Sequence, residues 1–257
     1  MSILLLGYDS EGIKEDFPSE KVGLKAIAKI HQKHNVSGTL FILGRAFLSD
    51  VKFYKEIFSE FPFDIQQHTY SHIMLNNLDV PSYGGNRAPI EMIREELPFM
   101  QDILKKYLGI KANGLRAPVS YLTGLQGETE VLEAIRSSGI DFVSSDASDS
   151  WSQFLTGEKK SAQPYWYPTG TLEIPMHSLH DGVWKDRYGY DQLERMTDYY
   201  QKELTRFGGN IYAPVFHPWI LANGDPEGVV LDDLIQHAKE KSFKIMSYHQ
   251  MWESFLS

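Results

Sequence analysis

Short apolar runs alternate with longer amphipathic segments along most of the chain. The first run, residues 3–6, is apolar at every position, which indicates a strand buried on both faces. The longer segments carry apolar residues at helical spacing, and several of them end at a glycine or a proline. The predicted strands are residues 3–6, 36–43, 63–67, 113–116, 140–143, 211–216 and 243–246, with an extended piece at 171–176. The predicted helices are residues 19–34, 50–61, 89–108, 128–138, 191–207, 229–242 and 248–255.

Strands that alternate with helices predict an α/β fold with a mainly parallel sheet. Residues 149–167 show no clear period, so we expect a long loop there. No internal repeat, low-complexity tract or linker divides the chain. We therefore expect residues 1–257 to form a single domain, at a length that α/β barrels commonly reach.

Composition and charge narrow the classes of partner. The net charge of -9 argues against a nucleic-acid partner bound through its phosphates. The chain has no cysteine, which excludes disulfides and thiolate metal ligands. The apolar run near the N-terminus is too short for a signal sequence or a membrane span. We expect a cytoplasmic protein without a membrane span.

Charged and imidazole side chains follow five of the predicted strands. These residues are Asp9 and Glu11, His68 and His72, Arg116, Asp146, and His217. If the sheet closes into a barrel, the carboxyl ends of its strands meet at one mouth, where α/β barrel enzymes place their chemistry. The same positions would otherwise be turns with solvated side chains and isolated ion pairs.

The histidine pair His68 and His72 provides the most specific chemical signal. Histidines four positions apart also occur by chance, so the pair alone is weak support for a metal site. A carboxylate from Asp9 or Glu11 would complete a three-ligand catalytic metal site with an open position for water. The other carboxylate could then act as a general base, and His217 could protonate a leaving amine.

Five motifs together resemble the polysaccharide deacetylase family, also called the NodB-homology group or carbohydrate esterase family 4. They are residues 7–12 (GYDSEG), 68–72 (HTYSH), 116–118 (RAP), 145–146 (SD) and 216–217 (FH), in the order found in that family. The later runs 164–166 and 172–175 resemble a subgroup with peptidoglycan-deacetylase-like and allantoinase-like members that lack a secretion signal. The resemblance implies a deformed (β/α) barrel with about seven parallel strands.

The resemblance also implies hydrolysis of an N-acyl group with a divalent metal, for which we expect Zn²⁺. Its ligands would be Glu11, His68 and His72. The family's usual motif has two adjacent aspartates, whereas Ser10 separates Asp9 from Glu11 here. Which of the two carboxylates is the metal ligand therefore stays open.

The other catalytic roles follow from the same resemblance. Asp9 is similar to the general base and Arg116 to the arginine that orients the base. His217 resembles the general acid, and Asp146 is the residue expected to tune it.

Three functions remain open on the sequence alone. The first is metal-dependent N-deacetylation of an amino sugar, as a precursor in surface polysaccharide biosynthesis. The second is hydrolysis of a small cyclic or linear amide on the same fold, with no metal required. Val119 favours it, because this residue stands where polymer-acting relatives carry an aromatic side chain. The third is a carbohydrate-binding protein without catalysis, which the joint presence of Asp9, Arg116 and His217 disfavours.

The remaining histidines divide into two groups. His31, His34, His237 and His249 fall on predicted helices, where we expect surface or capping positions. His177, His180 and Asp181 follow the extended piece at 171–176, so we expect them to border the mouth of the barrel.

Overall fold

The computed structural model describes residues 1–190 and 192–256 of the chain. Its strands are β1 (Ile3–Leu5), β2 (Gly7–Ser10), β3 (Thr39–Ile42), β4 (Asp64–Gln67), β5 (Gly114–Tyr121), β6 (Phe142–Asp146), β7 (Tyr165–Trp166), β8 (Leu172–Glu173), β9 (Ile211–Tyr212), β10 (Val215–Phe216) and β11 (Lys244–Met246). Its longer helices are α1 (Phe17–His34), α3 (Val51–Glu60), α4 (Ile90–Leu108), α5 (Thr129–Ser137), α8 (Leu193–Arg206) and α10 (Val229–Glu240). Shorter helices are η1 (Lys14–Asp16), α2 (Gly44–Ser49), α6 (Ser148–Leu155), α7 (Asp181–Tyr188), α9 (Pro218–Gly224) and α11 (Tyr248–Ser254).

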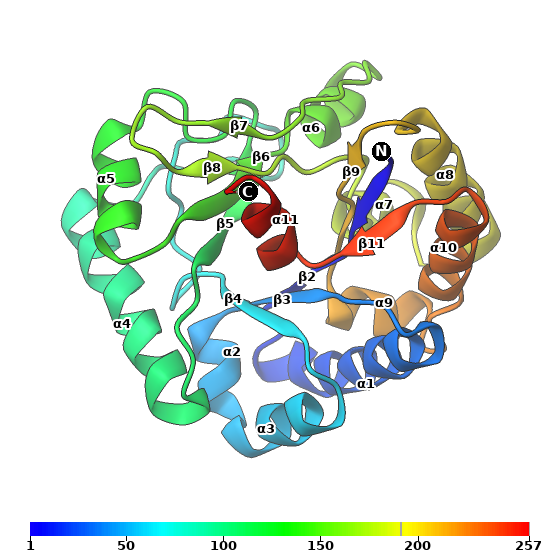
Figure 1. The fold of residues 1–257 in the computed structure, drawn as a ribbon, viewed down its shortest axis with the longest axis horizontal. Helices are drawn as coiled ribbons and strands as arrows, with labels where there is room; N and C mark the ends of the chain where they lie inside the picture. The colour runs from blue at the N-terminus through cyan, green and yellow to red at the C-terminus, as the bar shows by residue number, and fades with distance from the viewer. Residues whose placement is uncertain (191, 257) are drawn as a thin grey trace.

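Within the described residues, the strands form a sheet in the order β10-β2-β3-β4-β5-β6-β8-β7 and a smaller sheet β11-β1-β9. Every pairing is parallel except that of β7 with β8. Only residue 6 separates β1 from β2, so the two sheets share one continuous apolar segment. The sheet curls, with helices packed around its outside (Figure 1). This arrangement confirms the predicted deformed (β/α) barrel.

The barrel closes at a seam between the segment after β8 and the β9–β10 strands. The seam has no regular ladder of hydrogen bonds. Met176 N donates to Asp146 O on the β6 side, and His177 N donates to Ala213 O on the other side. The segment that follows therefore lies close to both β6 and β10.

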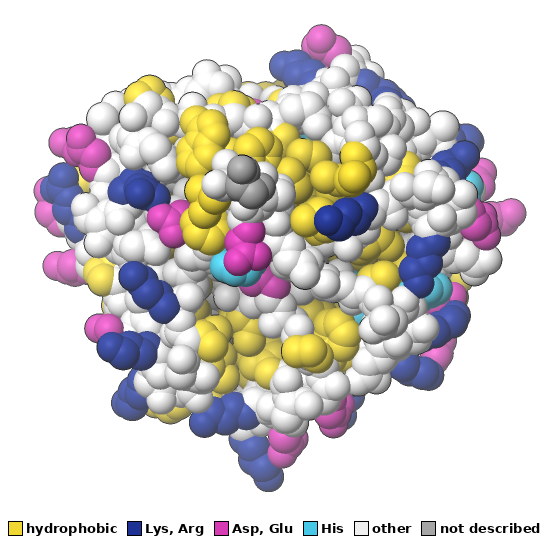
Figure 2. Space-filling view, viewed as in Figure 1, with side chains coloured by type: hydrophobic (Ala, Val, Ile, Leu, Met, Phe, Trp, Pro, Cys, Tyr) yellow, Lys and Arg dark blue, Asp and Glu magenta, His cyan; other side chains and the backbone are white. Residues whose placement is uncertain are grey.

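The C-terminal helix α11 covers the end of the barrel opposite the mouth. The backbone N–H groups of Tyr248 and His249 donate to the side chains of Thr39 and Asp64, which begin β3 and β4. Figure 1 looks onto this end. Figure 2 shows apolar side chains gathered around α11 on this face, with most charged side chains nearer the rim. No helix in the described part of the chain is long and apolar enough to cross a membrane.

Three local expectations are wrong. Gly7–Ser10 is a strand and not a turn, because residues 7–10 are buried beside β3 and β10. The expected loop at 149–167 contains most of α6 and all of β7. The short helices η1, α2, α7 and α9 occur where none was predicted. By contrast, the helix predicted at residues 191–207 is confirmed as α8 (Leu193–Arg206), and Asp191 itself lies outside the described residues.

Candidate active site

Glu11 follows strand β2, and its carboxylate lies beside two histidine rings. Its Oε2 atom is 3.2 Å from Nε2 of His68 and 2.9 Å from Nε2 of His72. One ligand atom from each of the three residues lies within 4.8 Å of the others. Burial would raise the pKa of Glu11, but the hydrogen bonds with both histidines hold it well below its usual range. An ionised carboxylate and two imidazoles therefore meet at one point.

The loop at 68–72 has a backbone shape that brings both rings to the same side. Thr69 and His72 adopt left-handed φ values of 60° and 67°. The hydroxyl of Thr69 accepts the backbone N–H of His72 at 3.1 Å. Glu96 of α4 accepts both the backbone N–H and the hydroxyl of Ser71. Side chains thus satisfy backbone groups of a loop that lies outside the helices and strands.

A buried carboxyl group supports the loop that carries Glu11. Glu20 of α1 accepts the Ser10 hydroxyl at 2.6 Å and the backbone N–H of Gly12 at 3.3 Å. Burial raises the pKa of Glu20 to about 8. The two residues that flank Glu11 are therefore tied to α1.

The donor set fits a divalent cation. Nδ1 of His68 lies 2.9 Å from the carbonyl oxygen of Arg116, which can only accept, so Nδ1 carries a proton. A ring that is protonated at Nδ1 can offer its Nε2 atom to a cation, and the carboxylate of Glu11 lies on that side of the ring. Two imidazoles and a carboxylate, with one imidazole held by a backbone carbonyl, are typical of catalytic zinc sites.

Asp9 lies at the base of the site beside the buried guanidinium of Arg116. Asp9 Oδ1 and Arg116 Nε are 3.5 Å apart, and the arginine side chain is fully buried. The guanidinium packs over the rings of Phe41 and Tyr248, and its Nη2 donates to the Tyr248 hydroxyl at 3.0 Å. Asp9 Oδ1 has no hydrogen-bond partner within the described part of the chain. Oδ1 is the buried oxygen that faces Arg116, so the ion pair orients a carboxylate that also lines the cavity.

His217 follows β10 and is held by a carboxylate on its far side. Its Nδ1 donates to Asp181 Oδ1 at 2.5 Å, and its backbone N–H donates to Asp181 Oδ2 at 2.6 Å. Its Nε2 lies 3.6 Å from Oε1 of Glu11. Burial would lower the pKa of His217, but the charges of Asp181 and Glu11 and the hydrogen bond to Asp181 raise it to about 10. Nε2 therefore carries a proton toward the site at neutral pH.

The structure assigns the place beside His217 to Asp181 and not to Asp146. The carboxylate of Asp146 accepts the backbone N–H of Ser148 and the hydroxyl of Tyr165. Burial raises the pKa of Asp146. Asp146 ends β6, whereas Asp181 begins α7, a helix with no clear sequence signal, so chain position alone did not identify the pair.

His180 completes a second cluster with Asp181 and His217, whose ligand atoms lie within 4.8 Å of one another. Nδ1 of His180 accepts the backbone N–H of Val183 at 3.3 Å and caps α7. Asp181 is already bonded to His217. These hydrogen bonds account for the cluster without a second cation.

Two other histidines are structural. His31 is fully buried, with Nε2 at 2.6 Å from the Tyr8 hydroxyl and Nδ1 at 3.0 Å from Val36 O, which corrects the expected surface position. His177 is also buried, and its Nδ1 accepts the backbone N–H of Ala213 across the seam. Both rings are therefore occupied within the fold.

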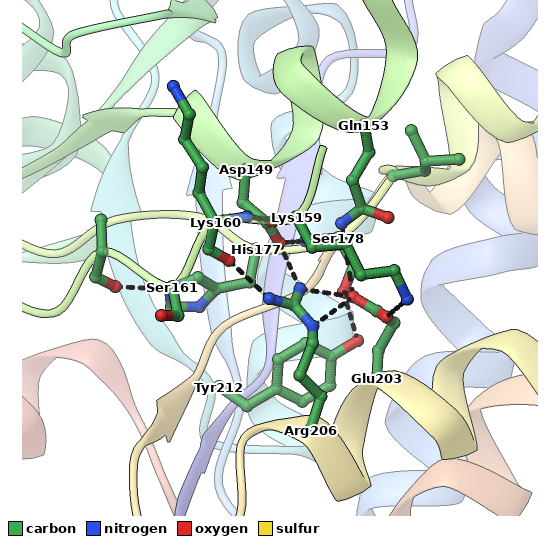
Figure 3. Close-up of polar contacts among 12 residues, drawn as sticks. Asp149, Gln153, Lys159, Lys160, Ser161, His177, Ser178, Glu203, Arg206 and Tyr212 are labelled. Carbon is green, nitrogen blue, oxygen red and sulfur yellow. Dashed lines mark hydrogen bonds and ion pairs between the residues drawn. The ribbon is translucent and has the colours of Figure 1, made fainter. Parts of the chain in front are cut away.

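A buried ionic network lies behind the site, at the seam of the barrel (Figure 3). Arg206 donates to Asp149 at 2.6 Å and to Glu203 at 2.5 Å, and the side chains of both acids are fully buried. Asp149 also accepts the backbone N–H of Ser178, and Glu203 accepts its hydroxyl. Ser178 has a left-handed φ of 68°. The network thus fixes residues 177–181, the segment that delivers the partner of His217.

The candidate catalytic side chains open into one cavity of about 220 Å³. Its walls combine the polar groups above with apolar and aromatic side chains. The lining includes Asp9, Glu11, His68, His72, Tyr83, Val119, Trp151, Met176, His180, Asp186 and His217. Apolar walls with a few convergent polar groups are typical of sites for small ligands.

The family assignment rests on a sequence match. Residues 15–143, about half of the chain, match the family model described as polysaccharide deacetylase. The chain belongs to the polysaccharide deacetylase family. The matched span contains His68, His72 and Arg116, whereas Asp9, Glu11 and His217 lie outside it.

Solved structures share the fold of this polysaccharide deacetylase family member at low sequence identity. A Mycobacterium smegmatis protein described as a polysaccharide deacetylase has a TM-score of 0.68 at 15% identity, over 98% of this chain and 89% of that one. The PuuE allantoinase has a TM-score of 0.62 at 15% identity, over 95% and 85%. A CE4 family pseudoenzyme from Bacillus anthracis has a TM-score of 0.61 at 17% identity, over 97% of this chain but only 64% of that one. None of the curated proteins compared with the chain matches it.

Proposed function

We propose that this member of the polysaccharide deacetylase family is a metal-dependent hydrolase that removes an N-acetyl or another N-acyl group from an amino sugar. The observation that carries the proposal is the placement of Glu11 between His68 and His72, with Asp9 and His217 in the same cavity. Family membership supports the reaction class, amide-bond hydrolysis by N-deacetylation. Within this reaction class, the proposed substrate is a precursor in surface polysaccharide biosynthesis.

Glu11, His68 and His72 would hold a divalent ion, for which Zn²⁺ fits best. When bound, the ion would act as a Lewis acid on the acyl carbonyl. The hydrogen bond between His68 Nδ1 and the Arg116 carbonyl keeps the ring turned toward Glu11.

Asp9 and His217 divide the proton transfers. The carboxylate of Asp9, which lines the cavity, accepts a proton from the attacking water. Arg116 holds the Asp9 carboxylate in place from below. His217 Nε2 donates a proton to the departing amine, and Asp181 keeps the proton on Nδ1 and the ring in its orientation. The amine leaves in neutral form, which makes it a better leaving group.

The test measures acetate release from N-acetylated monosaccharides and short oligosaccharides by purified protein supplied with Zn²⁺. We expect turnover by the wild type and none by Asp9→Asn, while bound zinc stays at the wild-type level. If no acylated sugar is turned over and the protein binds no metal, the proposal is wrong.

Hydrolysis of a small cyclic or linear amide is the second candidate. Val119 supports it, because this residue stands where polymer-acting relatives carry an aromatic side chain. Val119 lines the cavity and adopts a left-handed φ of 65° at the irregular end of β5. Turnover of small amides that persists after metal removal and in His68→Ala would favour this candidate. Sugar deacetylation that is lost in both cases would exclude it.

A further inference from the structure

Tyr83 lies at the tip of a tight turn in the connection between β4 and α4. Leu78 and Gly85 pair in antiparallel fashion, with backbone hydrogen bonds in both directions. Inside this pair, Tyr83 N donates to the carbonyl oxygen of Val80 at 3.0 Å. The turn therefore has its own hydrogen bonds and presents Tyr83 on a defined backbone.

The side chain of Tyr83 is anchored to two other elements. Its ring packs 5.2 Å from the ring of Trp151 and 5.9 Å from that of Phe154, both on α6. Its hydroxyl donates to the carboxylate of Asp186 on α7. Asp186 also pairs with Lys185 at 2.9 Å, so the anchor on α7 includes a charge pair.

The strand order shows which part of the barrel mouth the Tyr83 turn covers. In the sheet, β4 is followed by β5, β6 and β8. The turn leaves from β4, yet Tyr83 contacts α6, which follows β6, and α7, which follows β8. The turn therefore spans the ends of β5 and β6 at the mouth of the barrel.

Tyr83 and Asp186 line the same cavity as Glu11 and His217. At about 220 Å³, this cavity is smaller than the roughly 300–1,000 Å³ of sites for drug-sized ligands. An internal residue of a long glycan carries sugar on both sides and would need an open groove across the mouth. A free sugar, or a residue at a chain end, needs space on one side at most.

We propose that Tyr83 is a specificity-determining residue that restricts this site to compact N-acylated sugars, either free or at the end of a chain. The inference rests on the proposed N-deacylase function and adds the class of substrate. Internal residues of a polymer are excluded because the Tyr83 turn and its anchor on α7 occupy one side of the mouth.

The experiment compares a free N-acetylated monosaccharide with the matching β-linked N-acetylated tetramer. Acetate release is measured for both, and mass spectrometry of the end-labelled tetramer locates the residue that loses its acetyl group. For the wild type we expect turnover of the monosaccharide, of the tetramer's terminal residue, or of both. Deacetylation of internal residues by the wild type would overturn the proposal, and this result requires no variant.

Variants test whether Tyr83 sets this limit. Tyr83→Ala should raise the rate on internal residues relative to the monosaccharide about tenfold, the scale at which one pocket contact discriminates. Tyr83→Phe keeps the ring and should keep most of the selectivity. Pro81→Ala, an exposed change in the same turn, should match the wild type. If Tyr83→Ala fails to fold, Tyr83→Leu replaces it with the same expectation, and unchanged selectivity in the folded variant contradicts the role of Tyr83.

Binding separates this proposal from the proposed function. If no acylated sugar is hydrolysed, the function fails, but calorimetry on the wild-type protein still compares the affinities for monosaccharide and tetramer. Tetramer binding that is less than about tenfold tighter than monosaccharide binding supports the size limit, because only the chain end then engages the cavity. A larger gain overturns it.

Discussion

His217 Nδ1 and Asp181 Oδ1 lie 2.5 Å apart, and the other oxygen of the same carboxylate accepts the backbone N–H of His217. Asp181→Asn keeps the shape of the side chain but removes the charge that raises the pKa of His217. We expect kcat to fall about 10²-fold and the alkaline limb of the pH profile to move to lower pH, with bound metal unchanged. Asp146→Asn changes a carboxylate that does not contact His217 and should lower kcat less. Equal decreases in kcat for the two variants would contradict the assignment of Asp181.

Metal removal should affect activity and stability together. A chelator should abolish hydrolysis and lower the melting temperature, because an ion bound only by the folded protein stabilises it. Added Zn²⁺ should restore both. His72→Ala should weaken zinc binding by more than the roughly 10–100-fold expected for an outer hydrogen-bonding partner. His249→Ala, on the opposite end of the barrel, is the matched control and should retain its zinc.

The buried pair of Asp9 and Arg116 should show coupling in stability. Arg116→Met leaves a carboxylate buried without its counter-charge, and we expect a loss of about 3–5 kcal/mol in the free energy of unfolding. In the double variant Asp9→Asn with Arg116→Met, part of this loss should be recovered, since no charge remains unpaired. Activity should stay absent in both. Additive losses in denaturant unfolding would show that the two groups do not interact.

Arg206 should be needed for stability and, indirectly, for catalysis. Arg206→Met leaves the buried acids Asp149 and Glu203 without their shared cation, at a cost of about 3–5 kcal/mol. Because Asp149 also holds Ser178, we expect kcat to fall while KM changes little. Lys202→Met, an exposed change on the same helix, should stay within about 0.5 kcal/mol of the wild type. A wild-type kcat in folded Arg206→Met would argue against this positioning role.

His31 should make stability depend on pH. Burial lowers the pKa of His31 to about 4, below the value of about 6.5 expected in the unfolded chain. Between these values the unfolded chain binds more protons, so the free energy of unfolding should fall as the pH drops from 6.5 to 4, by roughly 3 kcal/mol in total. His31→Gln removes this titration. Urea unfolding at pH 7 and pH 5 should show a smaller loss for the variant than for the wild type.

The sequence predicted the regular part of the barrel because its signals there are strong. The apolar runs of β1 and β3 and the amphipathic pattern of α4 each appear within a few residues of their predicted bounds. The short helices α7 and α9 were missed, since each is shorter than the window in which helical spacing becomes visible. Strand ends indicated which residues would gather at the mouth, and Glu11, His68 and His72 do meet there.

The pairing of side chains could not be predicted in the same way. Asp146 ends a predicted strand and was the natural partner for His217, but the distance between two side chains depends on how the seam closes. The seam is formed by single hydrogen bonds and by the Arg206 network, which have no local sequence pattern. The anchor between Tyr83 and Asp186, 103 positions apart, is hidden from the sequence for the same reason.

The Arg116 guanidinium spans the inside of the barrel, from Asp9 near the mouth to the hydroxyl of Tyr248 at the start of α11. The last helix therefore reaches the proposed base through a single side chain. A deletion or fusion that displaced α11 would therefore change the position of the Asp9 carboxylate, although α11 lies at the opposite end of the barrel.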